Sequence, residues 1–188
     1  MHQHTETPDD MLRAAIRAVR AGGLGLPRVL DGLPAAIYLT DTEGVITHYN
    51  RACIAFAGRT PRVGQDSWCV TWKLYTEEGE YLPHDQCPMA VAVRERRTIR
   101  GARAMAERPD GKYVSFQPYP TPVFDGAGKL IAAINLLAEV PSLRQAQTLR
   151  AQAARCRRLV NLWPDRRGVV ISMAAEYDRK ALAIEERH

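Results

Sequence analysis

The chain has few of the features that mark membrane, secreted or metal-dependent proteins. None of its apolar runs approaches the ~18 residues that a membrane-spanning helix requires. Its first ten residues, MHQHTETPDD, lack the basic and apolar regions of a signal peptide, so the expected location is the cytoplasm. No two of its four cysteines form a CxxC motif, which argues against a disulfide framework and leads us to expect no metal site. These cysteines are Cys53, Cys69, Cys87 and Cys156.

Signatures of catalysis are also absent. None of the four serines lies in a GxSxG motif, and no Walker A, GxGxxG or HExxH pattern occurs. The glycine-rich segment at 22–25 lacks the lysine and the preceding strand of a phosphate-binding loop. The chain also lacks the phosphoacceptor motif and the ATP-binding domain of a histidine kinase. We therefore expect that the protein is not an enzyme and has no catalytic residues.

The positive charge is confined to one end of the chain. Basic and acidic residues balance over 1–26, with three of each, and over 27–140, with thirteen of each. Residues 141–188 carry ten basic and five acidic residues, so this tail accounts for the whole net charge of +5. The central region therefore gives no electrostatic reason to expect nucleic-acid binding.

The N-terminal half predicts a helix, a hairpin and a second helix. Apolar residues recur on one helical face over 8–21, and a glycine-rich break follows. Residues 36–40 are apolar and β-prone, the turn Asp41–Gly44 follows, and a second strand runs over 45–49. Asn50 is positioned to cap a helix that ends at Gly58.

The second half of the central region predicts one helix and three strands. The helix spans 85–97, with Asp85 as its N-cap and Pro88 in its first turn. Strands are expected at about 98–107, 112–119 and 129–138, separated by turns that carry Asp-Gly pairs. The last strand is apolar on both faces, and we expect it to be central in the sheet and covered on one side.

The C-terminal tail predicts two helices. Apolar residues repeat at steps of three and four through residue 163, close to heptad spacing. After Trp163-Pro164-Asp165 a second helix is expected over about 165–186, with one apolar face. That face comprises Val170, Met173, Ala174, Tyr177, Ala181 and Ile184. The two helices could form a hairpin, or a bent helix that continues into a partner chain.

The order of these elements resembles the PAS (Per-Arnt-Sim) sensory domain over about 27–140. The resemblance rests on segments that match in order and spacing. They are Leu33-Pro34-Ala35-Ala36-Ile37, Asp41-Thr42-Glu43-Gly44-Val45-Ile46, Tyr49-Asn50-Arg51-Ala52, Leu82-Pro83-His84-Asp85, Arg108-Pro109-Asp110-Gly111, Pro122-Val123-Phe124-Asp125 and Ala133-Ile134-Asn135. The pattern is similar to the type found in bacterial histidine kinases and diguanylate cyclases.

The resemblance implies a fold class and a domain plan. It implies an α+β fold, in which a PAS-like five-stranded antiparallel sheet carries helices on one face. This domain, at 27–140, would be flanked by an N-terminal helix at 1–26 and by a C-terminal helical extension at 141–188. Such domains often hold a small ligand or cofactor, pass signals through their flanking helices, and form dimers.

Several residues are candidates for a ligand pocket. They are Trp68, Trp72, His84, Cys87, Met89, Val93 and Phe116. His84 is also the best candidate for a haem ligand, because some members of the resembled family bind haem near this helix. The cysteine motif through which light-sensing relatives attach flavin, Asn-Cys-Arg-Phe, is absent. Cys69 and Cys87 are more consistent with apolar filling of the core than with redox sensing. No cofactor is specified.

The leading hypothesis is a bacterial, cytoplasmic sensor module that is not an enzyme and relays ligand or partner binding through its flanking helices. A homodimer, a signalling-protein partner and a small-molecule ligand are its expected partners, with no membrane contact. The candidate association stripe is Leu149, Cys156, Val160 and Trp163. One alternative is a sensor that uses haem or another cofactor. The other is a nucleic-acid-associated regulator that acts through the arginine-rich tail.

Overall fold

A computed structural model describes residues 7–23, 25–141, 143–160 and 162–185. The chain divides into two compact units, Met1–Val140 and Pro141–His188, and each is described here by itself. Within the described ranges, no helix combines the length and the apolar character needed to cross a membrane. The three-part division expected from the sequence stays a prediction.

The first unit is built on an antiparallel sheet with strand order β2-β1-β7-β5-β4-β3, and β6 also pairs with β7. The strands are β1 (Ala36–Thr40), β2 (Ile46–Tyr49), β3 (Lys73–Tyr75), β4 (Ala104–Glu107), β5 (Tyr113–Pro118), β6 (Thr121–Phe124) and β7 (Leu130–Glu139). The α+β fold class expected from the PAS resemblance is confirmed.

The strand count differs from the expected five for two reasons. The strand expected at 112–119 extends further, as β5 and then β6, with an interruption that ends at Pro120. Proline has no N–H to donate to a ladder, so the strand breaks there. A short extra strand, β3, pairs with β4 at the edge of the sheet.

Two predicted boundaries in the middle of the chain are wrong. Helix α4 spans Pro88–Glu95, its N-cap is Cys87 rather than Asp85, and His84–Gln86 form a separate 3-10 turn. The residue before a proline avoids helical backbone angles, and Cys87 is extended, so the helix begins at Pro88. The strand expected at 98–107 is limited to 104–107, after a segment in which Gly101 has φ of +76°.

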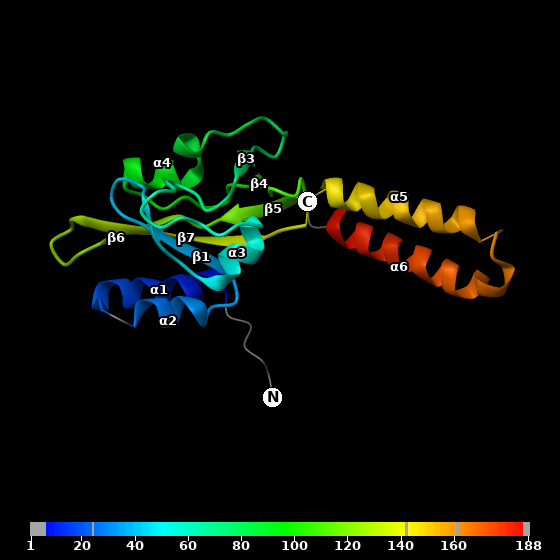
Figure 1. The fold of residues 1–188 in the computed structure, drawn as a ribbon, viewed down its shortest axis with the longest axis horizontal. Coiled ribbons are helices and arrows are strands. Elements are labelled where there is room, and N and C mark those ends of the chain that lie inside the picture. The colour runs from blue at the N-terminus through cyan, green and yellow to red at the C-terminus, as the bar shows by residue number, and fades with distance from the viewer. Residues whose placement is uncertain (1–6, 24, 142, 161, 186–188) are drawn as a thin grey trace. The chain divides into compact units, whose positions relative to one another are not determined.

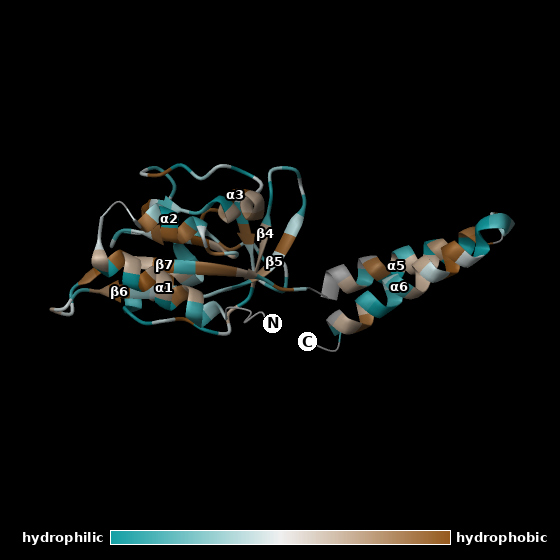
Figure 2. Cartoon of the chain, turned by 90° about the horizontal axis from the view of Figure 1, so that it is seen from below, coloured by the Kyte–Doolittle hydropathy of each residue, from teal (hydrophilic) through white to brown (hydrophobic). Residues whose placement is uncertain are grey.

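Hydrophobic cores cover both faces of this sheet, because side chains alternate along each strand. The α4-side core includes Tyr38, Phe56, Met89 and Phe116. The α1-side core includes Leu12, Leu30, Ile37 and Ile134. Figure 1 shows α1 (Pro8–Ala21) and α2 (Leu26–Asp31) on the face opposite α4. The final strand, β7, is therefore covered on both sides rather than one, and Figure 2 shows its hydrophobic stretch beside α1.

A buried amide holds the start of the domain together. Asn50 caps α3 (Arg51–Ala57), accepting from the backbone N–H of Cys53, and it also accepts from that of Ile37. Its side-chain NH₂ donates to three carbonyls of the segment that enters β1, those of Leu30, Leu33 and Ala35. The cap expected at Asn50 is therefore present, and it also fixes the entry into the sheet.

The second unit is a helical hairpin of α5 (Leu143–Leu159) and α6 (Arg167–Glu185). Of the two arrangements that the sequence allowed, the chain adopts the hairpin. Its contact surface is made mainly of small residues, namely Ala146, Ala153, Val170, Ala174 and Ala181. Met173, expected on the inner face, is 43% exposed, and the side chain of Ile184 lies outside the described part of the chain. Ion pairs join Arg150 and Arg157 to Asp178 across the two helices.

Candidate functional site

The predicted pocket residues divide into a buried group and an open group. Cys87, Met89 and Val93 lie at the start of α4 and along it, and Phe116 lies on β5; all four belong to the α4-side core. The ring of Phe116 meets that of Phe56 edge-on, with centroids 5.2 Å apart. These four residues are packed within that core, and Val93 also lines a second pocket beside Trp68. Trp68, Trp72 and His84 instead line a surface cleft.

This cleft has a volume of about 660 Å³, and its wall is about equally polar and apolar. Besides the three predicted residues, its lining includes Arg59, Arg62, Asp66 and Thr71. Trp72 is 45% exposed at its edge, while Thr71 is buried with its hydroxyl 3.5 Å from Nε2 of His84. A cleft with hydroxyl, imidazole and indole groups can hold a small polar molecule with a flat apolar part.

Charges in the cleft are partly neutralised by one carboxylate. Asp66 pairs with both Arg59 and Arg62, and Arg59 also donates to the carbonyls of Val70 and Thr71. Burial opposes ionisation of Asp66, but hydrogen bonds from the Arg62 backbone and the Arg59 side chain outweigh it and lower the pKa of its carboxyl.

His84 is positioned as a neutral imidazole. Burial and the nearby Arg59 guanidinium lower its pKa below the usual value, so it is uncharged at neutral pH. A neutral imidazole can donate a hydrogen bond to a ligand through one ring nitrogen and accept one through the other. Its role as a haem ligand stays a prediction.

Trp68 is held in an unusual backbone conformation at the centre of this site. Its φ is +66°, a left-handed value that is uncommon for a bulky residue. Its N–H donates to the carbonyl of Gly44 at 2.7 Å, and its ring lies where a β-carbon on Gly44 would be. Strain of this kind at a surface cleft is a recognised indicator of function. The sequence gives no sign of this backbone conformation.

Two polar residues behind Trp68 were not among the sequence candidates. The hydroxyl of Tyr38 donates to the carbonyl oxygen of Trp68 at 2.7 Å, and the amide of Asn135 donates to that hydroxyl at 3.0 Å. Burial, together with the neighbouring thiols, raises the pKa of Tyr38 well above its usual value, so its proton stays in place. A tyrosine and an asparagine facing each other from adjacent strands of a mainly apolar sheet could have signalled this pair.

The three cysteines of the first unit are buried thiols. Burial raises the pKa of Cys53 and of Cys87 to about 12, and it also raises the pKa of Cys69. Thiolate is the reactive form of cysteine, so these protonated thiols are unreactive in the folded state. Within the described residues, no group of three or more His, Cys, Asp or Glu side chains is arranged to hold a metal ion.

The residues of the candidate association stripe are distributed along the hairpin. Leu149 contacts Ala146 and Ala181 between the two helices. Cys156 and Val160 are half-buried, and Trp163 is 52% exposed. Their role in association stays a prediction.

Comparison with known proteins finds similarity in structure. An RNA-binding light-oxygen-voltage receptor is 20% identical with a TM-score of 0.46, over 61% of this chain and 32% of the receptor. A LOV protein from Rhodobacter sphaeroides is 15% identical with a TM-score of 0.46, over 96% of this chain and 97% of that protein. A PAS domain from Colwellia psychrerythraea is 14% identical with a TM-score of 0.41, over 60% and 92%. No family model matches, and neither does any curated protein.

Proposed function

We propose that the protein is a non-enzymatic PAS-type sensor that binds a small molecule in the Trp68 cleft and relays this event to its flanking helices. The observation that carries the proposal is a continuous set of polar contacts that runs from Trp68, through the sheet, to α1. Through these contacts, a small movement of Trp68 can change the position of α1 on the opposite face of the sheet.

The first part of the route crosses β1 and β7. Tyr38 on β1 bonds to the carbonyl of Trp68, and Asn135 on β7 bonds to the Tyr38 hydroxyl. The Asn135 amide oxygen then accepts from the backbone N–H of Tyr119 at 3.0 Å. Tyr119 lies between β5 and β6, and the same N–H also donates to the backbone carbonyl of Leu136 on β7 at 2.8 Å. Buried and satisfied polar contacts of this kind fix one arrangement of the sheet.

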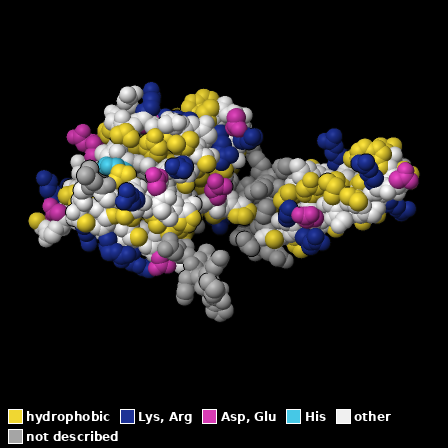
Figure 3. Space-filling view, turned by 60° about the horizontal axis from the view of Figure 1, so that its bottom comes forward, with side chains coloured by type: hydrophobic (Ala, Val, Ile, Leu, Met, Phe, Trp, Pro, Cys, Tyr) yellow, Lys and Arg dark blue, Asp and Glu magenta, His cyan; other side chains and the backbone are white. Residues whose placement is uncertain are grey.

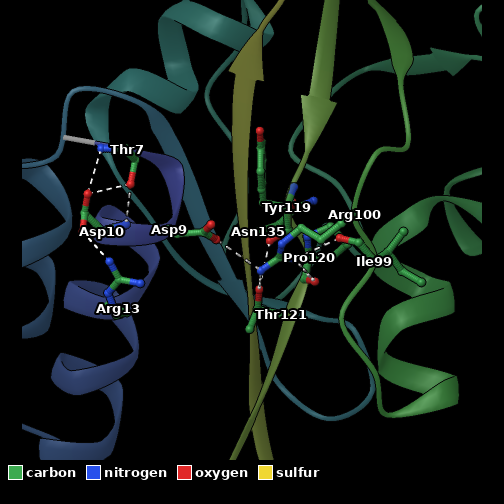
Figure 4. A network of polar contacts seen from close by, with 10 residues as sticks. All are labelled: Thr7, Asp9, Asp10, Arg13, Ile99, Arg100, Tyr119, Pro120, Thr121 and Asn135. Carbon is green, nitrogen blue, oxygen red and sulfur yellow. Dashed lines mark hydrogen bonds and ion pairs between the residues drawn. The ribbon is translucent and has the colours of Figure 1, made fainter. Parts of the chain in front are cut away.

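The second part of the route runs through Arg100, as Figure 4 shows. Its guanidinium lies over the ring of Tyr119 at 5.5 Å and donates to the hydroxyl of Thr121 and the carbonyl of Pro120. The same guanidinium is 3.8 Å from the carboxylate of Asp9, in the first turn of α1. Arg100 thus connects the break in the strand to the N-terminal helix.

The mechanism is a shift between two populations. A ligand that favours one position of Trp68 changes the hydrogen bond to Tyr38, and with it the balance between two placements of Arg100 and α1. Such a shift is limited by the difference in ligand affinity for the two states. Within the homodimer that we also propose, the helices then alter their contacts with a second copy or with a signalling partner.

Native mass spectrometry of the full chain tests the ligand part of this proposal. A discrete added mass that is lost on Trp72→Ala, but retained in Trp163→Ala as a matched control with a similarly exposed tryptophan, supports binding in the cleft. Absence of any bound mass, together with no response of tryptophan fluorescence to a metabolite library, argues against a small-molecule sensor.

The two alternative functions, a cofactor sensor and a nucleic-acid regulator, are tested separately. An absorption band above 300 nm after purification from haem-replete cells would favour a cofactor sensor. Salt-dependent binding to DNA that is lost when Arg155 and Arg158 become alanine would favour the nucleic-acid regulator. Arg157, in the same basic stretch, is already paired with Asp178 in the hairpin, so less of this charge is free for phosphates.

A further inference from the structure

A second pocket next to Trp68 is lined by three basic residues and no acidic one. It has a volume of about 420 Å³. Its lining comprises Thr42, Trp68, Val93, Arg94, Arg96, Lys129 and Leu130. Arg94 and Arg96 come from the end of α4, and Lys129 comes from the turn between β6 and β7. Three cations from two distant parts of the chain therefore meet at one pocket.

Of the acidic residues nearest in the chain, Asp41 and Asp125 accept hydrogen bonds within their own turns, and Glu43 is exposed and does not line the pocket. Asp125 accepts from the backbone N–H of Lys129 and of Ala127, inside its own turn. Asp41, which precedes Thr42, accepts in the same way from the backbone of Glu43 and Val45.

At the end of α4 the carboxylate is also occupied, since Glu95 pairs with Arg97. Arg94 donates to the carbonyl oxygen of Asp85, which leaves its charge unneutralised. Within the described ranges, none of the three lining cations forms an ion pair with a carboxylate. The three cations are exposed to solvent, and since none is paired directly with a carboxylate, a bound anion would relieve the repulsion between them.

The backbone at Arg96 is also unusual. Arg96 ends α4 with φ of +52°, in the left-handed region that normally favours glycine or asparagine at this position. A residue with a long charged side chain is conformationally unfavourable there. Arg96 occupies this position, and its guanidinium lies beside the pocket.

The other walls of the pocket suit a flat apolar group. The side chains of Val93 and Leu130 are buried and form its apolar part, and the Trp68 indole offers an aromatic face. Indole and aliphatic surfaces bind planar rings, while arginine and lysine bind phosphate oxygens. We propose that this pocket binds a small aromatic molecule that carries a phosphate monoester. This site is additional to the Trp68 cleft and does not depend on the sensor proposal.

Titration of the full chain with phenyl phosphate tests this inference, followed by tryptophan fluorescence and by calorimetry at low salt. Phenol and inorganic phosphate serve as the two half-ligands. We expect saturable binding of phenyl phosphate that weakens as salt rises, with both half-ligands at least about tenfold weaker. No saturable binding of phenyl phosphate, or inorganic phosphate binding equally well, would overturn the proposal.

Variants then assign binding to the pocket. Arg96→Gly and Lys129→Gln are each expected to weaken phenyl phosphate binding about tenfold, since each removes one charge-assisted contact. Arg96→Gly should leave the melting temperature unchanged or raise it, because glycine suits the left-handed backbone. Arg20→Gln, an exposed arginine in the last turn of α1 and outside the pocket, is the matched control. Binding that is unaffected by both pocket variants, or reduced equally by Arg20→Gln, would contradict the assignment.

Discussion

At the scale of single residues, Asn50 shows how one side chain can secure several segments. It is buried, and its amide takes part in five hydrogen bonds with backbone groups before and after it. A short polar side chain before an apolar stretch is enough to predict a helix cap. The three hydrogen bonds that the Asn50 amide donates to the loop before β1 depend on how that loop folds back. The local sequence does not encode this arrangement.

Asn50→Ala is expected to lower the free energy of unfolding by about 3 kcal/mol or more, because several buried backbone groups lose their partner at once. Urea unfolding of the full chain measures the loss. Asn50→Ser is the control: its hydroxyl can still cap α3, so it should recover about 1 kcal/mol of that loss. Equal stability of the alanine variant and the native chain would show that the amide contacts are not formed.

The cysteines give a second prediction at this scale. Because burial holds the pKa of Cys53 and Cys87 near 12, these thiols are protonated at pH 8. Cys156 is half-buried, on the helical hairpin. A disulfide reagent at pH 8 should therefore modify one thiol quickly in the folded chain and all four after unfolding. Cys156→Ser should remove the fast phase; any fast thiol in that variant would contradict the buried environment.

At the scale of elements, two turns with the same hydrogen bonds offer a matched comparison. In the turn after β1, Asp41 accepts from two backbone N–H groups and Gly44 has φ of +88°. In the turn after β6, Asp125 and Gly128 repeat this arrangement, with φ of +79°. Only Gly44 is covered by a side chain, the ring of Trp68.

Gly44→Ala should therefore cost more than Gly128→Ala. A β-carbon at Gly44 would lie 2.3 Å from the Trp68 ring, whereas one at Gly128 meets no atom within 4 Å. We expect a loss of about 1 kcal/mol for Gly128→Ala from backbone strain alone, and about 3 kcal/mol for Gly44→Ala. Tryptophan emission should shift only in the second variant. Equal losses without a spectral shift would mean that Trp68 does not occupy this position.

The order of elements could be predicted from sequence because local patterns specify it. Alternating apolar residues, Asp-Gly turns and the Asn50 cap place the main strands and α3 close to their observed positions. The 3-10 turn at His84–Gln86 was not predicted, because aspartate is a favourable N-cap and Asp85 therefore suggests an earlier helix start. The extended backbone of Cys87, before Pro88, excludes that start. Three of the predicted pocket residues, Trp68, Trp72 and His84, line one cleft, and their role in ligand binding stays a prediction. The left-handed backbone of Trp68 and the contact between Tyr38 and Asn135 depend on tertiary structure, which no local pattern reports.

At the scale of the whole molecule, the helical hairpin leaves much apolar surface uncovered. Val169, Ile171, Met173 and Leu182 of α6 are 43–63% exposed, and Figure 3 shows hydrophobic side chains gathered on this unit. The contact between its helices consists largely of alanine, so little apolar area is buried. Helices of this kind gain most of their stability from packing against further elements. A second copy of the hairpin would supply them, in keeping with the proposed homodimer.

Light scattering during size exclusion tests this association. We expect a dimer at micromolar concentration for the native chain and a monomer for the double variant Ile171→Glu, Leu182→Glu, because burying two carboxylates in an apolar contact is unfavourable. The double variant Ser172→Glu, Arg179→Glu alters exposed polar positions of the same helix and should stay dimeric. A native chain that is monomeric throughout this range would refute the proposed dimer.

The central claim is that the Trp68 site and α1 are coupled through the sheet. Hydrogen exchange of the α1 amides in Tyr38→Phe tests it most directly, since this change removes the hydroxyl between Trp68 and Asn135 and leaves the ring. Tyr75→Phe, which removes a hydroxyl bonded to Glu107 on the opposite edge of the sheet, is the control. We predict faster exchange over residues 8–21 in Tyr38→Phe and no change there in Tyr75→Phe. Unchanged exchange of α1 in Tyr38→Phe, or equal changes in both variants, would contradict the coupling.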